Sequence, residues 1–281
     1  MAGEVNDFDK TYPRMLHQIP SPPKKLYYKG NFNEGIFENC LAVVGSRKMS
    51  PYGERAMEKI FSTLSSKITI VSGFMHGVDA EAHRKALKFG LNTIAVMPCG
   101  INLIHPKDQN NLYKEILNAG GLVLSEFEGY FEPKVWTYPR RNRIVAGLST
   151  AVLVIEAALE SGSLITARMA HSFGRHVLVV PGSIFSDLNS GKVQISNEFA
   201  KTIDSGLFIN KYFNLDYTGD VSEENKADKN QILGLLKSTP MTIDDLKKQF
   251  PNKEISQIST EITLLTINNS VVEREGVFYA C

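Results

Sequence analysis

The sequence lacks the features by which several large classes of protein are recognised. It holds only 3 cysteines in 281 residues. Cys40, Cys99 and Cys281 are too far apart in sequence for a C-x-x-C zinc motif, and His76 and His83 lack the H-E-x-x-H spacing. Unpaired cysteines fit a reducing compartment, no apolar run exceeds strand length, and the opening MAGEVNDFDK does not resemble a signal peptide. We therefore predict a cytoplasmic protein with no metal, no other cofactor and no membrane segment.

An excess of charge of one sign is also missing. Lys and Arg number 31 against 30 Asp and Glu, which gives a formal net charge of +1. A protein so balanced does not attract nucleic acid through its overall field. Any nucleic-acid site must therefore be a local cluster of cations.

Two nucleotide-binding signatures are absent as well. No G-x-G-x-x-G follows the first apolar run, and the second run ends in Ser-Gly rather than in an acidic residue. Gly191-Lys192 lacks the glycine spacing of a P-loop. We therefore expect neither a bound dinucleotide nor a kinase-like reaction.

The sequence does contain a regular alternation of short apolar runs and helix-like stretches. Near-continuous apolar strands that alternate with helices are typical of a parallel sheet covered on both faces. We predict an α/β fold, a Rossmann-like, doubly wound and mostly parallel sheet, over residues 36–213. The apolar runs occupy residues 41–44, 68–71, 93–97, 122–124, 151–155 and 177–180.

Three further segments flank this core. Residues 1–35 are predicted to form an extended strap, because X-Pro steps disfavour helix. Residues 214–228 are polar and charged and are predicted to be a linker. Residues 229–281 show three helical patterns and a hairpin pattern, the order of a winged helix. They hold six cations and six acids, so we expect this module to contact protein or nothing rather than duplex DNA.

Small residues follow most of the predicted strands. In an open parallel sheet, ligands bind beyond the carboxyl ends of the strands, where small residues and helix N-termini let N–H groups approach an anion. One such loop is explained by the needs of a tight turn, whereas several loops at one edge favour an anion site. The phosphate-binding candidates are Ser72, Gly73, Ser161, Gly162, Ser163 and Thr166.

The segment Lys134–Arg143 (KVWTYPRRNR) contains four cations, no acid, a tyrosine and the only tryptophan. Arginine forks bind phosphates, and aromatic rings stack on unpaired bases. We expect this segment to be a loop at the same edge of the sheet. A solvated charged surface would show the same run of cations, so the composition leaves both interpretations open.

At these residues the chain resembles the DprA/Smf family of DNA-processing proteins. The motifs VVGSR, VSGFMHGVDAEAH, TIAVMPCGI, LSEF, YPRRNRIVAGLS, VIEAALESGSLITARMA and FGRHVLVVPG follow in the family's order within residues 12–183. The resemblance implies a homodimeric Rossmann-like protein that is not an enzyme. It also implies binding of single-stranded DNA, protection of incoming DNA, and loading of the RecA recombinase during natural transformation. Single-strand-binding protein is a further partner that it suggests.

The resemblance also implies which residues contact DNA. Arg47 and the Lys134–Arg143 segment match the family's DNA pocket, and Tyr138 takes the place of an aromatic that stacks on a base. After Pro181-Gly182 the family's glycine-rich string is replaced. The predicted DNA-binding residues are Gly45, Ser46, Arg47, Lys48, Lys134, Tyr138, Arg140, Arg141, Asn142 and Arg143.

Two other functions are left open. Related Rossmann-like proteins hydrolyse nucleoside monophosphates with an arginine and a glutamate near a P-G-G-x-G-T-x-x-E loop, but residues 181–184 lack the second glycine. Glu126 and Glu156 follow strands and are either an acid/base pair or acceptors for loop backbone, Arg141 or Arg143. The second alternative is a nucleotide-sensing scaffold whose last module recruits a protein. We predict no catalytic residue.

Overall fold

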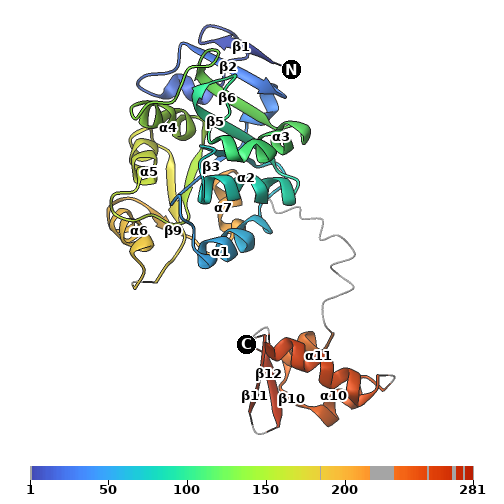
Figure 1. Cartoon of the computed structure of the whole chain (residues 1–281). Coiled ribbons are helices and arrows are strands. Elements are labelled where there is room, and N and C mark those ends of the chain that lie inside the picture. The colour runs from blue at the N-terminus through green and yellow to red at the C-terminus, as the bar shows by residue number, and fades with distance from the viewer. Residues whose placement is uncertain are drawn as a thin grey trace. The chain divides into compact units, whose positions relative to one another are not determined.

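The chain divides into two compact units, Met1–Gly219 and Asp220–Cys281, which are described one at a time (Figure 1). The predicted linker, residues 214–228, falls mostly outside the described residues, so its boundaries stay a prediction. The computed structural model describes residues 2–183, 185–215, 231–251, 253–267, 270–274 and 276–280.

The large unit is built on a nine-stranded sheet in the order β1-β2-β6-β5-β4-β3-β7-β8-β9. From β6 to β9 all neighbouring strands pair in parallel, whereas β1 and β2 form an antiparallel edge. The predicted Rossmann-like sheet is confirmed, and each predicted apolar run forms a strand. The strands are β1 Ala2–Asn6, β2 Lys25–Gly30, β3 Cys40–Val44, β4 Thr69–Ser72, β5 Asn92–Gly100, β6 Leu122–Phe127, β7 Ala151–Val154, β8 His176–Val179 and β9 Lys201–Thr202.

Helices cover both faces of this sheet (Figure 1). Side chains of a strand alternate between the faces, so Leu41 and Val43 join one core while Ala42 and Val44 join the other. Residues of α1, α2, α3 and α7 pack on the first face, and residues of α4, α5 and α6 on the second. The helices are α1 Pro51–Phe61, α2 Val78–Lys88, α3 Asn110–Asn118, α4 Thr137–Leu148, α5 Gly162–Ser172, α6 Asp187–Glu198 and α7 Gly206–Tyr212.

Residues 1–35 are part of the sheet rather than a strap beside it. β2 pairs with β6, and β1 pairs with β2. The prolines lie between these two strands and leave the N–H groups of β2 free to pair. A short 3-10 helix, η1 (Arg14–Gln18), lies between β1 and β2 and packs its buried Leu16 near Gly147 of α4. The prolines therefore restrict the connection between β1 and β2 and not the whole of residues 1–35.

The strand order reverses at β3. The chain adds β4, β5 and β6 on one side of β3 and then returns to place β7, β8 and β9 on the other. Because the loops after β3 and β7 depart toward opposite faces of the sheet, a crevice opens between them beyond the carboxyl ends of the strands. This is the position at which the sequence predicts an anion site.

The described residues of the small unit form three helices and a three-stranded sheet with the order β10-β12-β11. Thr242 caps α10 in a capping box with Asp245. The order of helices and hairpin agrees with the expected pattern, while its assignment as a winged helix stays a prediction. No helix in the described ranges of either unit is long and apolar enough to cross a membrane. The elements are α9 Gln231–Ser238, β10 Met241–Thr242, α10 Ile243–Gln249, α11 Ile255–Ile267, β11 Val271–Arg274 and β12 Val277–Ala280.

A glycine on α6 allows this helix to dock against the connection after β7. A Cβ on Gly191 would lie 2.5 Å from the Ala158 carbonyl oxygen and 2.7 Å from Leu164 Cδ1. We expect Gly191→Ala to lower the free energy of unfolding by about 1–3 kcal/mol, although alanine favours helix over glycine. A Cβ added to Gly234 on α9 would meet no atom within 4 Å. Gly234→Ala is therefore the control and should not destabilise the small unit. Denaturant unfolding measures both, and an unchanged midpoint for Gly191→Ala would contradict this docking.

Candidate functional site

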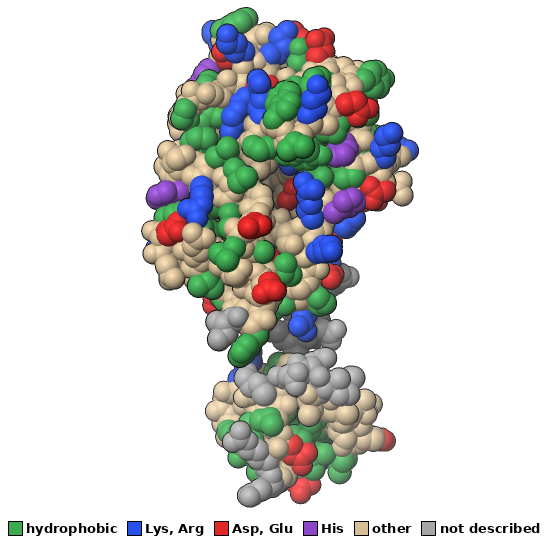
Figure 2. All heavy atoms as spheres, turned by 60° about the vertical axis from the view of Figure 1, so that its left-hand side comes forward, with side chains coloured by type: hydrophobic (Ala, Val, Ile, Leu, Met, Phe, Trp, Pro, Cys, Tyr) green, Lys and Arg blue, Asp and Glu red, His purple; other side chains and the backbone are tan. Residues whose placement is uncertain are grey.

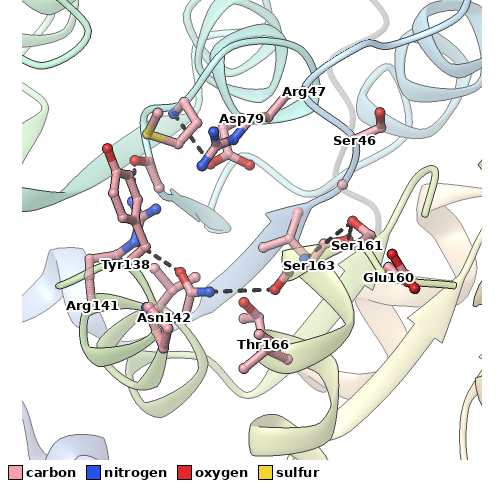
Figure 3. A pocket seen from close by; sticks show the side chains of 18 of the residues that line it. Ser46, Arg47, Asp79, Tyr138, Arg141, Asn142, Glu160, Ser161, Ser163 and Thr166 are labelled. Carbon is pink, nitrogen blue, oxygen red and sulfur yellow. Dashed lines mark hydrogen bonds between the residues drawn. The ribbon is translucent and has the colours of Figure 1, made fainter. Parts of the chain in front are cut away.

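A cavity of about 460 Å³ lies beyond the carboxyl ends of β3, β4 and β7. Figure 2 shows the large unit hollowed near the middle of one face, and Figure 3 shows the side chains around a pocket. The walls come from the β3–α1 and β4–α2 loops, the start of α4, the β7–α5 connection and the first turns of α5. The predicted residues that line it are Gly45, Ser46, Arg47, Gly73, Tyr138, Arg141, Asn142, Ser161, Gly162, Ser163 and Thr166.

The β3–α1 loop is held between two neighbouring elements. Ser46 N donates to the Glu156 carbonyl oxygen at 2.8 Å, and the Ser46 carbonyl oxygen accepts from Val78 N at 3.0 Å. A Cβ on Gly45 would lie 2.6 Å from Val78 Cγ2, so only glycine fits this passage. The loop therefore has a fixed path, which carries the exposed Arg47 to the mouth of the cavity (Figure 3).

Arg141 is a buried side chain that ties α4 to the residue after β4 and to the middle of β5. It is 4% exposed. Its Nη1 donates to the Val96 carbonyl oxygen at 2.6 Å and also to the Gly73 carbonyl oxygen. A side chain on Gly73 would overlap the guanidinium, so glycine is required there. Burial raises the pKa of Asp79, and the positive charge of Arg141 opposes that rise.

Most of the segment predicted as a loop is helix, because α4 begins at Thr137. On a helix, residues three and four positions apart share a face. Tyr138, Arg141 and Asn142 have this spacing, and all three line the cavity. Arg140 and Arg143 are also three residues apart, but they lie on another side of the helix and line a neighbouring hollow instead. The helical phase thus divides the cations of this segment between two surfaces.

Tyr138 forms one wall of the cavity (Figure 3). The Arg47 guanidinium carbon lies 5.4 Å from the centroid of its ring. The Tyr138 hydroxyl is 2.9 Å from His105 Nε2 in a hydrogen bond. This bond fixes the ring by its far end, so its orientation is set before any ligand binds.

The amino-terminal end of α5 forms the opposite wall. Ser161 caps the helix, and its Oγ accepts from Ser163 N at 3.3 Å. Asn142 Nδ2 donates to the Gly162 carbonyl oxygen at 3.5 Å, which links α4 to this wall. The N–H groups and the positive end of the helix dipole favour an anion here. Glu160 also lines the cavity, so the cavity is not lined by cations alone.

Five predicted contact residues lie outside the cavity lining. Ser72 is fully buried and donates its hydroxyl to the Val43 carbonyl oxygen at 2.6 Å. Lys48 is exposed beyond Ser46, and Lys134 lies with its Nζ 5.7 Å from the Phe131 ring centroid. The other two are Arg140 and Arg143.

Arg140 and Arg143 are both paired with one carboxylate. Arg140 donates from Nε and Nη2 to Glu126 at 2.9 Å each, and Arg143 Nη2 donates to Glu126 Oε1 at 2.5 Å. Glu156 is 1% exposed and accepts from Ser50 N at 2.9 Å and from the Ser50 hydroxyl. Both glutamates therefore accept hydrogen bonds from protein groups. Arg143 is a partner of Glu126, whereas Arg141 bonds to neither glutamate.

The other polar residues considered from the sequence have structural partners. Asp79 Oδ2 accepts from Met75 N at 3.3 Å and so braces its loop. His83 Nδ1 lies 2.7 Å from Thr93 Oγ1, and burial lowers the pKa of this histidine to about 3. Among the described residues, no group of three or more His, Cys, Asp or Glu side chains is arranged to hold a metal ion.

Sequence patterns missed a buried lysine beside the site. Lys192 on α6 is 2% exposed and donates to the carbonyl oxygens of Ile155 at 2.7 Å and Val180 at 2.8 Å. Burial lowers its pKa to about 8. These carbonyls follow β7 and β8, so the lysine ties α6 to the edge that carries the cavity. A lone lysine in a helical pattern gives no sequence signal for this role.

The fold and the cavity define a Rossmann-like α/β protein with an anion-favouring site at the strand-order reversal of its sheet. The chain belongs to the DNA recombination-mediator protein A family, whose sequence model matches residues 5–213. The predicted family is thereby confirmed.

Named relatives extend this result. DNA processing protein DprA of Streptococcus pneumoniae is 42% identical over 198 residues, 70% of each chain. Protein Smf of Escherichia coli is 35% identical over 268 residues, 94% of this chain and 67% of the relative. The first name describes a DNA-processing protein, and the second is a family name.

Two solved structures share the fold. DNA processing protein A from Streptococcus pneumoniae superposes with a TM-score of 0.72 at 38% identity, covering 76% of this chain and 75% of that one. DNA processing protein A from Helicobacter pylori, described for its single-stranded DNA binding mode, gives a TM-score of 0.64 at 29% identity. It covers 76% of this chain and 94% of that one.

The burial of Arg141 separates two effects of mutation in the cavity. We expect Arg141→Met to lower the free energy of unfolding by about 2–5 kcal/mol, because it leaves the carbonyls of Gly73 and Val96 without their donor and Asp79 without its nearby cation. Arg47→Met removes an exposed cation from the same cavity and should unfold like the wild type. Urea unfolding of the two variants measures the difference, and equal midpoints would show that Arg141 is not a structural residue.

Proposed function

We propose that this chain binds single-stranded DNA in the cavity beyond β3 and β7 and catalyses no reaction on it. The observation that carries the proposal is the pairing of Arg47 with the Tyr138 ring at one wall, opposite the amino-terminal end of α5. A phosphate fits between a cation and a helix N-terminus, and a base fits against an aromatic ring. The family assignment and the relative from Helicobacter pylori support the same ligand.

Single strands are favoured over duplex because only an unpaired base can enter the cavity and stack. The wall offers one aromatic ring, several hydroxyls and backbone donors, and one exposed arginine. Such a site reads the sugar-phosphate backbone and the face of a base, which all sequences share. We therefore propose little dependence on base sequence.

The hydrolase alternative is less well supported. The acid/base pair considered from the sequence is not available to a ligand, because Glu156 is held by Ser50 and Glu126 by Arg140 and Arg143. Neither glutamate lines the cavity. No observation on the described residues favours the nucleotide-sensing scaffold over DNA binding.

The wider role proposed from the family is assistance to recombination. We propose that the bound strand is protected and passed to the RecA recombinase during natural transformation, with a homodimer as the acting form. Single-strand-binding protein is the further proposed partner, and the cytoplasm is the proposed compartment. The module of residues 229–281 is proposed to contact protein or nothing rather than duplex DNA, because its six cations and six acids balance.

Salt dependence tests the assignment of roles within the cavity. For wild type we expect a log–log slope of affinity against salt near −3, from about four phosphates at ~0.7 each on a single strand. Arg47→Ala should make the slope shallower by about 0.7, whereas Tyr138→Ala should weaken binding by about 1–3 kcal/mol with nearly the same slope. Fluorescence anisotropy with a labelled oligonucleotide measures both.

The control for this series is Lys67→Ala, which removes an exposed cation just before β4, at the opposite edge of the sheet. It should bind like wild type. Thermal melts of each variant exclude unfolding as the cause of weaker binding. Equal affinity for duplex, or a salt-independent affinity, would refute the proposed function.

Truncation tests the role of the small unit. Deleting the residues after Gly219, where the two units divide, should leave the affinity for single-stranded DNA within about 2-fold, because the large unit contains the whole cavity and its own core. Anisotropy measures the affinity, and the melting transition of the shortened chain is the control for folding. A loss of 10-fold or more, about 1.4 kcal/mol, would place part of the DNA site in the small unit.

A further inference from the structure

A second surface lies on the side of α4 away from the cavity. Trp136, Arg140 and Arg143 are four and three residues apart and therefore share one side of this helix and its N-cap. Arg140 and Arg143 converge on Glu126 at the end of β6. The proposed function does not use this surface.

Three aromatic rings pack together on it. Phe127 and Phe131 stack with ring centroids 4.8 Å apart and planes 13° apart, and Trp136 meets the Phe127 ring edge-on at 5.7 Å. Trp136, the largest of the three, is 48% exposed. Stacking explains why the three rings contact one another, but it does not explain why Trp136 remains exposed.

Cations lie against these rings. The Arg140 guanidinium carbon is 5.7 Å from the Phe127 centroid and 5.9 Å from the Trp136 centroid. Lys134 Nζ is 5.7 Å from the Phe131 centroid. We call Phe127, Phe131, Lys134, Trp136 and Arg140 the aromatic platform. Cations and aromatic faces in alternation are what a single strand requires of a surface.

The backbone under the platform is held firmly. Gly100 N donates to the Phe131 carbonyl oxygen at 2.8 Å, and a Cβ on Gly100 would overlap that loop. The buried Thr137 hydroxyl donates to the Lys134 carbonyl oxygen at 2.7 Å and accepts from Lys134 N at 3.1 Å. The rings are thus presented in fixed positions, which lowers the entropy lost on binding.

Pro139 and Arg140 of α4 connect the cavity with the platform. Pro139 lines both the cavity and the neighbouring hollow that contains Arg140, Lys24 and Lys25. Figure 2 shows Lys or Arg and hydrophobic side chains intermingled above the central hollow of this face. A strand that leaves the cavity over Pro139 therefore meets the platform next.

We propose that the aromatic platform is a second stacking site for single-stranded DNA, which holds a base of the nucleotides that leave the cavity. The proposal rests on the proposed function, because the strand must first occupy the cavity. Arg140, Arg143 and Lys134 are the cations of this group, and Glu126, Glu128 and Glu132 are the acids of the same segment, so ring stacking rather than net charge carries the proposal. Trp136 supplies the exposed face for the base.

The wild-type protein contains its own probe, because Trp136 is its only tryptophan. We would titrate it with labelled oligothymidylates of increasing length and record label anisotropy and tryptophan emission together. Short oligonucleotides that fill the cavity should bind without quenching. Beyond a threshold length, affinity should rise about 5-fold or more, and tryptophan emission should fall in the same step.

Oligonucleotides whose added nucleotides are abasic separate stacking from charge. They extend the phosphate chain by the same length, so they should neither quench Trp136 nor give the same gain in affinity. An equal gain from the abasic extension would overturn the stacking site. Quenching that is already complete with the shortest oligonucleotide would also overturn it, because the platform would not be separate from the cavity.

Variants complete the test. Trp136→Leu should lose the gain of the long oligonucleotides and leave short ones unaffected, while Trp136→Phe should keep most of the gain. Tyr130→Ala is the matched control, since Tyr130 is 74% exposed in the same loop and is not part of the platform. Binding without any quenching or length step refutes the platform alone, whereas no binding at any length refutes the proposed function.

Discussion

The arrangement of both surfaces depends on one buried guanidinium. Arg141 donates to carbonyl oxygens just after β4 and in the middle of β5, and so fixes the rotation of α4 about its own axis. Successive side chains of an α-helix point in directions that differ by about 100° around its axis. With this rotation of α4, Tyr138 and Asn142 line the cavity, whereas Arg140 lies on the other side as part of the platform. A different phase would exchange the two sets and leave the cavity without its aromatic wall.

The arginines of α4 already have partners within the protein. Arg140 and Arg143 are paired with Glu126, and Arg141 is buried near Asp79. The exposed Arg47 is the cation that the cavity presents most openly to a ligand. Affinity in such a site must come largely from backbone donors, hydroxyls and ring faces. That conclusion agrees with the net charge of +1, which gives the protein no long-range attraction for DNA.

Sequence patterns predicted the sheet well and its edge strands poorly. The six apolar runs are central strands buried on both faces, and their composition is visible without any partner. β1, β2 and β9 are edge or near-edge strands whose side chains are partly exposed, so their pairing leaves little hydrophobic signal. The prolines after β1 suggested a strap for the whole segment, although they restrict only the connection between the strands.

The sequence by itself determined the fold and the edge of the sheet at which the cavity lies, because strand burial and small residues after strands are local properties. It also identified the cationic and aromatic segment. The tertiary structure alone decided how that segment is divided between two surfaces. The helical phase is set by carbonyl groups 68 and 45 residues away from Arg141 in the chain. Contacts across such separations exist only once the sheet has formed, and no local pattern encodes them.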